Sequence, residues 1–406
     1  MSGGVIVATL TLLLGIQPVT TDLYLPALPT LQSDLGGTVA GAQLTLSALI
    51  ICFGLGQLVC GPLADRFGRR PVLLAGLGLF TLASIAGAAS STIEMLIAWR
   101  ALQGAAMAAA VTGGRSIIRD LYQPAAGARV MSKALTGLGV IAVASPVLGG
   151  LIVEAFDWHA ALLALAVFGA ATLALVAWRF EETAPGRDPA ATRPRTVIAN
   201  WREVVSHPTF RAWTLLSACT YAALFIMLAG SSFVFIGVLG VPRHAFGALL
   251  GSMSMAYIVG TVLCRRLLVR HGLRGAVRRG AWLSLVGGLA MAALSLAGVH
   301  EVWAIAVPQY LYAMGHGIHQ PCAQAGAIGP FPEKAGTAAS LSGFAMTASA
   351  LAVGLWLGES LDGTVYPLTL GIGALSVCVA TVAWTLVQRH GEPPAPAGLA
   401  AGAQRA

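Results

Sequence analysis

Residues 41–90 decide the fold class, and they read GAQLTLSALIICFGLGQLVCGPLADRFGRRPVLLAGLGLFTLASIAGAAS. Two apolar runs, 41–64 and 70–90, are each long enough to cross a bilayer, because a spanning helix needs about 20 apolar residues. Only a short segment rich in arginine separates them. This alternation predicts two membrane-spanning helices joined by a tight basic loop.

The composition of the whole chain extends this interpretation. Of the 406 residues, 57% are hydrophobic and 10% are charged, whereas a soluble domain carries about 25% charged residues. The mean hydropathy is +0.79. These values exclude a soluble enzyme, a disordered chain and a coiled coil, and they leave a protein that crosses the bilayer many times.

The excess of basic residues has a topological explanation. A formal charge of +8 would suit a nucleic-acid-binding protein. The basic residues, however, interrupt long apolar runs instead of forming one patch, so we expect the lipid bilayer and not nucleic acid as a partner. All but two of the 24 basic residues, Arg100 and Arg243, fall on one side of the expected topology. This bias predicts a protein of the cell inner membrane with both termini in the cytoplasm.

We expect twelve spanning helices. They cover residues 5–31, 41–64, 70–90, 92–119, 127–152, 159–179, 210–238, 246–268, 277–297, 302–327, 336–358 and 366–388. The runs are too long and too continuous for the short alternating strands of a membrane β-barrel. The expected fold is therefore an all-α membrane protein.

A polar stretch, EETAPGRDPAATRPR at 181–195, divides six of these helices from the other six. Its proline and charge are typical of a linker, and Trp201–Arg211 could form a short amphipathic helix on the inner membrane surface. The expected divisions are a six-helix bundle at 1–180, a cytoplasmic linker at 181–209, a second six-helix bundle at 210–390 and a flexible tail at 391–406.

A faint internal repeat relates the two bundles. The segment GPLADRFGRR at 61–70 can be aligned with RRLLVRHGLR at 265–274, an offset of about half the chain. In this alignment, three residues of the first segment match three of the second: Arg66, Gly68 and Arg70 match Arg270, Gly272 and Arg274. Two pseudo-symmetric six-helix bundles are typical of transporters that hold substrate between their halves.

Five motifs resemble a known family. The loop GPLADRFGRR resembles the signature loop of the major facilitator superfamily, which predicts the major facilitator fold. The segments TDLYLPALP (21–29), RALQG (100–104) and SPVLGG (145–150) resemble its drug:proton antiporter branch, with Ser145 where that motif usually has glycine. GHGIHQPCAQAGAIGPF (315–331) is similar to the bicyclomycin-resistance (Bcr/CflA) group. The resemblance implies a multidrug exporter that exchanges protons for lipophilic antibiotics, works as a monomer and needs no cofactor.

Two charged residues inside spans are candidates for proton coupling. Asp22 is an acidic residue within the first span, where Pro18, Pro26 and Pro29 loosen the helix. An ionisable residue in the bilayer is costly and is functional by default. Arg100 lies at a compatible depth in the fourth span, and we hypothesise that it controls the protonation of Asp22, directly or through water. The alternatives are a structural Asp22 near the outer helix end and an arginine that holds backbone carbonyls.

Substrate recognition is expected in a large apolar cavity with few polar groups. By the family resemblance, helices 1, 4, 7, 8 and 10 line this cavity. The candidate binding residues are Tyr24, Gln103, Tyr221, Phe225, Phe233, Tyr257, Tyr310, His316 and His319. The two histidines lie three residues apart and could line the cavity, share the proton path or bond neighbouring helices. A metal site is disfavoured because no acidic residue lies beside them.

The basic loops and a proline-glycine motif are candidates for gating. Asp65 can face a helix N-terminus, and the family resemblance implies that this is the first turn of the eleventh span near Gly336. We also expect Arg66 or Arg69 to pair with Asp120, and Arg115 or Arg119 to pair with Asp65. Such pairs would close the cytoplasmic side in one state; the alternative is a loop that only sets topology. Pro146 would bend the fifth span as a hinge or a seal, or as an ordinary kink. The gating candidates are Gly61, Asp65, Arg66, Gly68, Arg69, Arg70, Arg115, Arg119, Asp120, Ser145, Pro146, Gly149 and Gly150.

Two rival functions remain open. A proton-linked transporter of an amino acid or a sugar would use the same fold, although the lack of a dense polar cluster argues against it. An intramembrane enzyme using His316 and His319 is disfavoured because the chain has no HExxH, no GxSxG and no paired carboxylates within spans. We therefore expect a protein that is not an enzyme and carries no metal.

Overall fold

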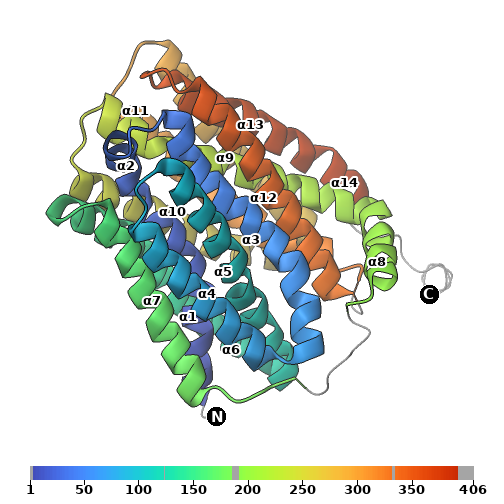
Figure 1. The fold of residues 1–406 in the computed structure, drawn as a ribbon. Helices are drawn as coiled ribbons and strands as arrows, with labels where there is room; N and C mark the ends of the chain where they lie inside the picture. Colours follow the sequence, from blue (N-terminus) through green and yellow to red (C-terminus); the bar gives the residue numbers. More distant parts are fainter. Residues whose placement is uncertain (1–2, 123, 185–191, 332–333, 392–406) are drawn as a thin grey trace, which may run out of the picture.

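A computed structural model describes residues 3–122, 124–184, 192–331 and 334–391. These residues are almost entirely helical (Figure 1). In the first part of the chain the helices are α1 (Gly3–Asp22), α2 (Leu28–Asp34), α3 (Val39–Phe67), α4 (Arg69–Ala88), α5 (Ile93–Leu121), α6 (Pro124–Ala155) and α7 (Trp158–Arg179). They are followed by α8 (Pro194–Ser206), α9 (Pro208–Ser232), α10 (Arg243–Leu296), α11 (Val302–Ile328), α12 (Ala335–Ser360), α13 (Tyr366–Trp384) and α14 (Leu386–His390).

The expected twelve spans are confirmed. Within the described ranges, 10 helical stretches are long and apolar enough to cross a membrane. One of them, α10, is two helices that meet at Gly272, where φ is 64° and ψ is −176°. The twelfth span is α11, whose buried face carries Gln309, His316, His319 and Gln320.

The first span differs from the continuous helix expected over 5–31. Helix α1 ends at Asp22, a 3-10 turn follows at Leu25–Ala27, and α2 begins at Leu28. Pro26 and Pro29 lie in the first two positions of the turn and of α2. Because proline has no N–H group, it is tolerated at a helix start and interrupts a helix interior. The break leaves Asp22 at a helix end.

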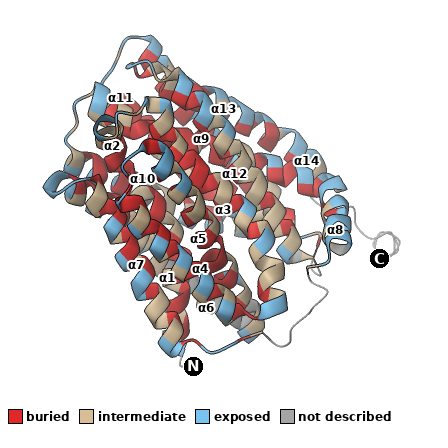
Figure 2. Ribbon diagram, in the orientation of Figure 1, coloured by how far each residue is buried: buried red, intermediate tan, exposed pale blue. Residues whose placement is uncertain are grey.

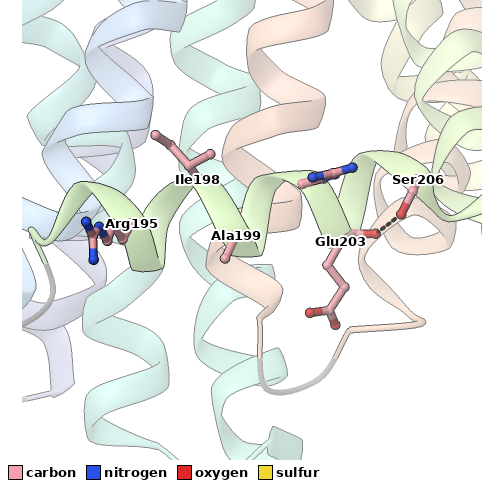
Figure 3. A pocket seen from close by; sticks show the side chains of 6 residues that line it. Arg195, Ile198, Ala199, Glu203 and Ser206 are labelled. Atoms are coloured by element: carbon pink, nitrogen blue, oxygen red, sulfur yellow. Dashed lines mark hydrogen bonds between the residues drawn. The ribbon is translucent and has the colours of Figure 1, made fainter.

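The amphipathic helix before the seventh span begins earlier than expected. Helix α8 covers Pro194–Ser206 instead of Trp201–Arg211, and α9 begins at Pro208. A proline at the first position of each helix explains both starts. In Figure 1, α8 lies across the end of the bundle near the start of α9, and Figure 3 shows it from close by. Residues 185–191 of the expected linker and residues 392–406 of the expected tail lie outside the described residues.

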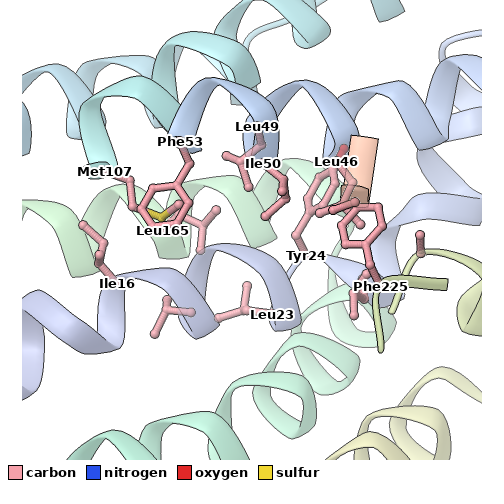
Figure 4. Close-up of a cluster of buried hydrophobic side chains, with 14 of the residues drawn as sticks. Ile16, Leu23, Tyr24, Leu46, Leu49, Ile50, Phe53, Met107, Leu165 and Phe225 are labelled. Atoms are coloured by element: carbon pink, nitrogen blue, oxygen red, sulfur yellow. The ribbon is translucent and has the colours of Figure 1, made fainter. Parts of the chain in front are cut away.

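The apolar side chains form two kinds of surface. Those that face neighbouring helices are buried, and others, such as Val140, Val167 and Trp178, are exposed on the outside of the bundle (Figure 2). Figure 4 shows part of the interior, where Ile16, Met107 and Phe225 lie among side chains from other helices. An apolar exterior around a packed interior is what a bilayer requires, since lipid tails are as apolar as leucine.

Two long seams join the N-terminal half (α1–α7) to the C-terminal half (α9–α14). One seam runs between α3 and α12, which lie side by side in Figure 1, and the other between α6 and α10. Small residues permit the close approach. A Cβ added at Gly54 or Gly354 of the first seam, or at Gly247 of the second, would collide with an atom of the facing helix.

The turns at Gly68 and Gly272 lie at one end of the bundle, called the basic end below. Toward this end the first seam thins. An added Cβ at Gly61 of α3 or at Gly336 of α12 would meet nothing within 4 Å. One turn from these two glycines the seam is still closed, because Ser340 Oγ of α12 lies 3.5 Å from the Gln57 carbonyl of α3.

Candidate functional site

Asp22 lies where the end of α1 meets the other half. Its Oδ1 accepts a hydrogen bond of 2.8 Å from Thr21 Oγ1. Tyr221 of α9 lies close enough for the charge of Asp22 to act on it, and its hydroxyl is hydrogen-bonded to the Gln17 side chain of α1. The candidate proton carrier is therefore linked to the C-terminal half through Tyr221.

Arg100 lies against α1 but does not pair directly with Asp22. Its side chain is 1% exposed, bonds Gln103 Oε1 and donates through Nη2 to the Thr20 carbonyl at 3.2 Å. The guanidinium lies over the Tyr24 ring, 4.1 Å from its centre, a favourable cation–π arrangement. Thr20 and Tyr24 are four residues apart and share a face, whereas Asp22 lies between them and faces elsewhere. Arg100 therefore holds a backbone carbonyl of α1, as the alternative expected, and its control of Asp22 through water stays a prediction.

Gln103 belongs to the packing around Arg100. Its Nε2 donates to Ser84 Oγ of α4 at 2.6 Å, and it is 1% exposed. On the next turn, a Cβ at Gly104 would collide with the Leu49 carbonyl of α3. These contacts fix α5 against α3 and α4.

The candidate aromatic residues do not converge on one point. Tyr24 is fully buried and bonds Thr45 Oγ1 at 2.9 Å, and Phe225 packs against α12 at 1% exposure. Tyr310 bonds Ser252 Oγ at 2.8 Å. Partly buried Phe233 begins a short π-helical turn, Phe233–Val238, that ends the α9 span. Three of the aromatic candidates meet another candidate residue: Tyr24 lies under Arg100, Tyr221 lies near Asp22, and Tyr257 lies beside His316.

The two histidines of α11 have different neighbours. His316 Nδ1 lies 3.0 Å from Thr220 Oγ1 of α9, and its ring centre is 5.6 Å from that of Tyr257. His319 is fully buried and lies against the second segment of α10, with Nδ1 3.4 Å from Ser284 Oγ. His319 therefore joins α11 to α10 within the C-terminal half, as the alternative of a bond between neighbouring helices predicted. His316 adjoins Thr220, the residue before Tyr221, and so lies near the seam. The described residues contain no group of three potential metal ligands.

The basic end of the N-terminal half carries an ion-pair cluster. Arg69 is 4% exposed; its Nη1 lies 2.7 Å from Asp65 Oδ1, and its Nε donates to Asp120 Oδ2 at 2.9 Å. The expected pairing with Asp120 is present through Arg69, not through Arg66, which donates to Thr192 Oγ1 at 2.8 Å.

Asp65 pairs with a residue of its own turn. Its ion-pair partner among the described residues is Arg69 and not Arg115, whereas the expected pairing with Arg119 stays a prediction because that side chain lies outside the described residues. A Cβ added at Gly336, in the first turn of α12, would meet nothing within 4 Å. In this structure Asp65 is therefore held by its own half.

Glu182 belongs to the same cluster, although the sequence interpretation gave it no role. Its carboxylate accepts from the backbone N–H of Arg69 at 2.8 Å and of Arg70 at 3.1 Å, while Arg70 Nη2 donates to the Ala177 carbonyl. It thus caps the start of α4, where unpaired N–H groups and the helix dipole favour an anion.

The motif at 145–150 lies at the opposite end of the seam between α6 and α10. A Cβ at Gly149 would collide with the carbonyl of Leu23, the residue after α1, and one at Gly150 would come 2.5 Å from the Arg243 carbonyl of α10. Ser145 Oγ donates to the Ile141 carbonyl at 2.7 Å, within the turn before Pro146. The paired glycines therefore bring α6 into backbone contact with both halves, and their roles as a seal or a hinge stay predictions.

Polar contacts between the halves continue at that end. Arg243 Nη2 donates to Thr30 Oγ1 at 2.8 Å, and the ring of His244 lies 2.6 Å from Glu154 Oε2. Gln43 Nε2 donates to the Ala229 carbonyl at 2.5 Å. Sequence reasoning missed these residues and also Gln17, Thr20 and Thr220; the available signal was a polar residue within a long apolar run.

Comparison with known proteins identifies the fold and the family. The sequence profile "Major Facilitator Superfamily" matches residues 10–355. The chain belongs to the major facilitator superfamily. Solved structures agree on the fold: the D-xylose–proton symporter covers 96% of this chain and 99% of its own at a TM-score of 0.73 and 14% identity. The xylose transporter XylE from E. coli, in a partially occluded inward open conformation, gives a TM-score of 0.74 at 12% identity over 95% and 98%.

Curated relatives in this superfamily are named for drug resistance. Multidrug resistance protein D of Escherichia coli (strain K12) is 30% identical over 82% of this chain and 83% of its own. The bicyclomycin resistance protein homolog of Haemophilus influenzae is 25% identical over 95% and 97%. The chloramphenicol resistance protein of Pseudomonas aeruginosa is 28% identical over 78% and 74%. The chain is thus a multi-pass membrane protein of a transporter superfamily, similar to drug resistance proteins over most of its length.

Proposed function

We propose that this protein exports lipophilic drugs across the cell inner membrane in exchange for protons that move inward. The basic end faces the cytoplasm in this proposal, with both termini there, because basic loops stay on the cytoplasmic side. The transported compound is a small molecule, the coupling ion is the proton, and the protein acts as a monomer without a cofactor or covalent chemistry.

The observation that carries the proposal is the position of Asp22. Asp22 is the last residue of α1, and its carboxylate lies near Tyr221 of α9 in the other half. A carboxylate there changes charge when it binds a proton, and a charge between two halves alters how strongly they associate. Proton entry can thereby favour one arrangement of the halves, as alternating access requires. The resistance proteins to which the chain is similar support drugs as the exported cargo.

The proposed gating uses contacts at the two opposite ends of the molecule. The contacts of Gly149 and Gly150 close the end away from the cytoplasm, and Asp65 is held by Arg69. We infer that in the opposite state Asp65 turns to the first turn of α12 and closes the cytoplasmic end. Arg100 then acts as a structural support that fixes α5 to the end of α1.

The test uses inside-out vesicles with an acidic interior. Addition of a drug panel that includes chloramphenicol and bicyclomycin should release protons from the vesicles of the unaltered protein. In Asp22→Asn we expect this release to fall to about a tenth or less, since the carboxylate is lost. Asp34→Asn, an exposed position at the end of α2, serves as the matched control and should behave as the unaltered protein.

Other outcomes decide among the alternatives. Drug-dependent release that survives in Asp22→Asn assigns the proton to another group, with His316 next. If no drug releases protons but a labelled amino acid or sugar is exchanged, the protein is a metabolite transporter on the same fold.

A further inference from the structure

Helix α8 has two chemically distinct faces. Val197, Trp201 and Val204 recur at helical spacing, and Val204 is fully buried against the bundle. The other face carries six exposed residues: Arg195, Ile198, Ala199, Arg202, Glu203 and Ser206. Figure 3 shows these side chains along one helix, outside the bundle. One face thus anchors α8, and the other has no partner for its arginines among the described residues.

On the outer face of α8, basic and apolar side chains form two separate lines along the helix. Arg195 and Arg202 are two helical turns apart and share one line along the helix. Ile198, 60% exposed, and Val205, 46% exposed, lie along one edge of this line. Two guanidinium groups beside an exposed apolar edge are the pattern of a helix in the plane of a membrane surface. The apolar edge enters the acyl boundary while the arginine heads stay at the level of the phosphates.

The position of α8 fits this orientation. It lies across the basic end of the bundle, transverse to the spanning helices (Figure 1), and α9 enters the membrane directly after it. With the basic end at the cytoplasm, as proposed above, the arginines would lie at the level of the lipid headgroups of the inner leaflet. Glu203 is an acid on this face, but it forms an ion pair with Lys334. Its negative charge is therefore balanced and does not repel an anion bound by the arginines.

We propose that the outer face of α8 binds the headgroups of anionic phospholipids through Arg195 and Arg202. The planar guanidinium matches phosphate oxygens in a bidentate manner. The site is separate from the Asp22 seam and does not depend on which compound the protein transports.

Binding at α8 reaches the start of α12. Glu203 bonds Lys334, the residue before α12. At the end of α8, His207 packs edge-on against Phe331 with ring centres 5.2 Å apart, and Phe210 packs against the same ring. A lipid that holds α8 at the surface also holds this entry to α12, the helix that packs against α3 of the other half.

Native mass spectrometry of the full-length protein tests the proposal. The protein is released from micelles that contain equal amounts of phosphatidylglycerol and phosphatidylcholine, and the retained lipids are counted. We expect preferential retention of phosphatidylglycerol by the unaltered protein. In Arg195→Gln/Arg202→Gln the apparent affinity for phosphatidylglycerol should fall on the order of tenfold.

Matched variants separate this site from general charge effects. Arg266→Gln/Arg270→Gln removes the same charge from exposed positions of α10 at the same end and should retain the lipid. Arg195→Lys/Arg202→Lys keeps the charge and should retain most of the binding. Thermal unfolding in phosphatidylcholine alone checks that every variant is folded.

Three results would overturn the proposal. They are equal retention of the two lipids by the unaltered protein, unchanged retention in the double glutamine variant, and an equal loss in the α10 control. Selective retention of an acidic protein in place of lipid would assign the face to a protein partner and would likewise overturn it.

Discussion

Gly68 and Gly272 lie at equivalent positions of the two halves, and their backbones agree. The φ and ψ angles are 102° and 160° at Gly68, and 64° and −176° at Gly272. Both pairs lie in a region that is essentially reserved for glycine. The alignment of 61–70 with 265–274 thus corresponds to a structural repeat, in which each turn joins two antiparallel spans.

The side chains around the two turns differ. Arg69, beside the first glycine, is bonded to Asp65 and Asp120. Near the second glycine, Arg274 donates to the Gln388 carbonyl at 2.9 Å, and Val269, in place of the acid, is 89% exposed. The two turns therefore share the glycine, whereas the cluster of Asp65, Arg69 and Asp120 belongs to the first turn. We infer that the charge cluster of the first turn holds Asp65 for gating and stabilises only the N-terminal half.

The largest expected difference between the turns is at the residue after the glycine. Arg69→Met removes the ion-pair partner of two carboxylates and should lower the free energy of unfolding by about 3–5 kcal/mol. The equivalent residue of the second turn is Leu273. Leu273→Met conserves volume and should cost less than about 1.5 kcal/mol. Denaturant or thermal unfolding in detergent measures both.

A charge-neutral partner variant sharpens this test. In Arg69→Met/Asp120→Asn the buried acid is also neutralised, so part of the lost stability should return. Equal destabilisation by Arg69→Met and Leu273→Met would contradict the assignment of the cluster to the first half alone.

Substitution of the glycines themselves should give a smaller difference. Gly272→Ala incurs only backbone strain, about 1–3 kcal/mol, because its Cβ would meet nothing within 4 Å. At Gly68 the new Cβ would also lie 2.5 Å from Glu182 Oε2. We therefore expect Gly68→Ala to lower the unfolding temperature more than Gly272→Ala does.

Removal of the carboxylate gives the control for this pair. In a Glu182→Ala background, Gly68→Ala and Gly272→Ala should cost similar amounts. A larger cost at Gly272 in the native background would show that the two turns are not equivalent.

The fold was predictable because its signals are long. Apolar runs near 20 residues predicted the number of spans, and the bias of basic residues supported this number while the direction it gives stays a prediction. The first span was harder, because a sequence shows that Pro26 and Pro29 weaken a helix but not where the helix stops. The start of α8 was missed for a related reason, since Pro194 lies within a stretch that reads as linker.

The site was less predictable than the fold. The sequence identified Asp22 and Arg100 as costly residues in the bilayer, but their pairing depends on which way each points from its helix. Arg100 lies over Tyr24, and Asp22 instead lies near Tyr221 from the other half. Asp22 and Tyr221 are far apart in the sequence, so no local sequence pattern predicts that they lie close together. Glu182 was missed because an acid in a polar stretch resembles any other linker residue.

Glu182 gives the smallest and most specific difference between the turns. Its carboxylate caps the first N–H groups of α4, and the second segment of α10 has no described counterpart. Glu182→Gln keeps the shape but loses the charge, so we expect a loss on the order of 1 kcal/mol, typical of a helix cap. Thermal unfolding near neutral pH measures this loss.

The same residue predicts a pH dependence with a definite sign. Burial raises the pKa of the Glu182 carboxyl, but hydrogen bonds from backbone N–H groups of Ala184, Arg69, Arg70 and Thr183 outweigh burial and hold the pKa below the usual 4.5. A carboxyl whose pKa is lower in the folded state contributes stability above its unfolded-state pKa and loses it as the pH falls through the folded-state pKa. The stability difference between the unaltered protein and Glu182→Gln should therefore be constant near neutrality and shrink below about pH 4.5. A stability difference that does not shrink on acidification would mean that the charge of Glu182 is not what stabilises the start of α4.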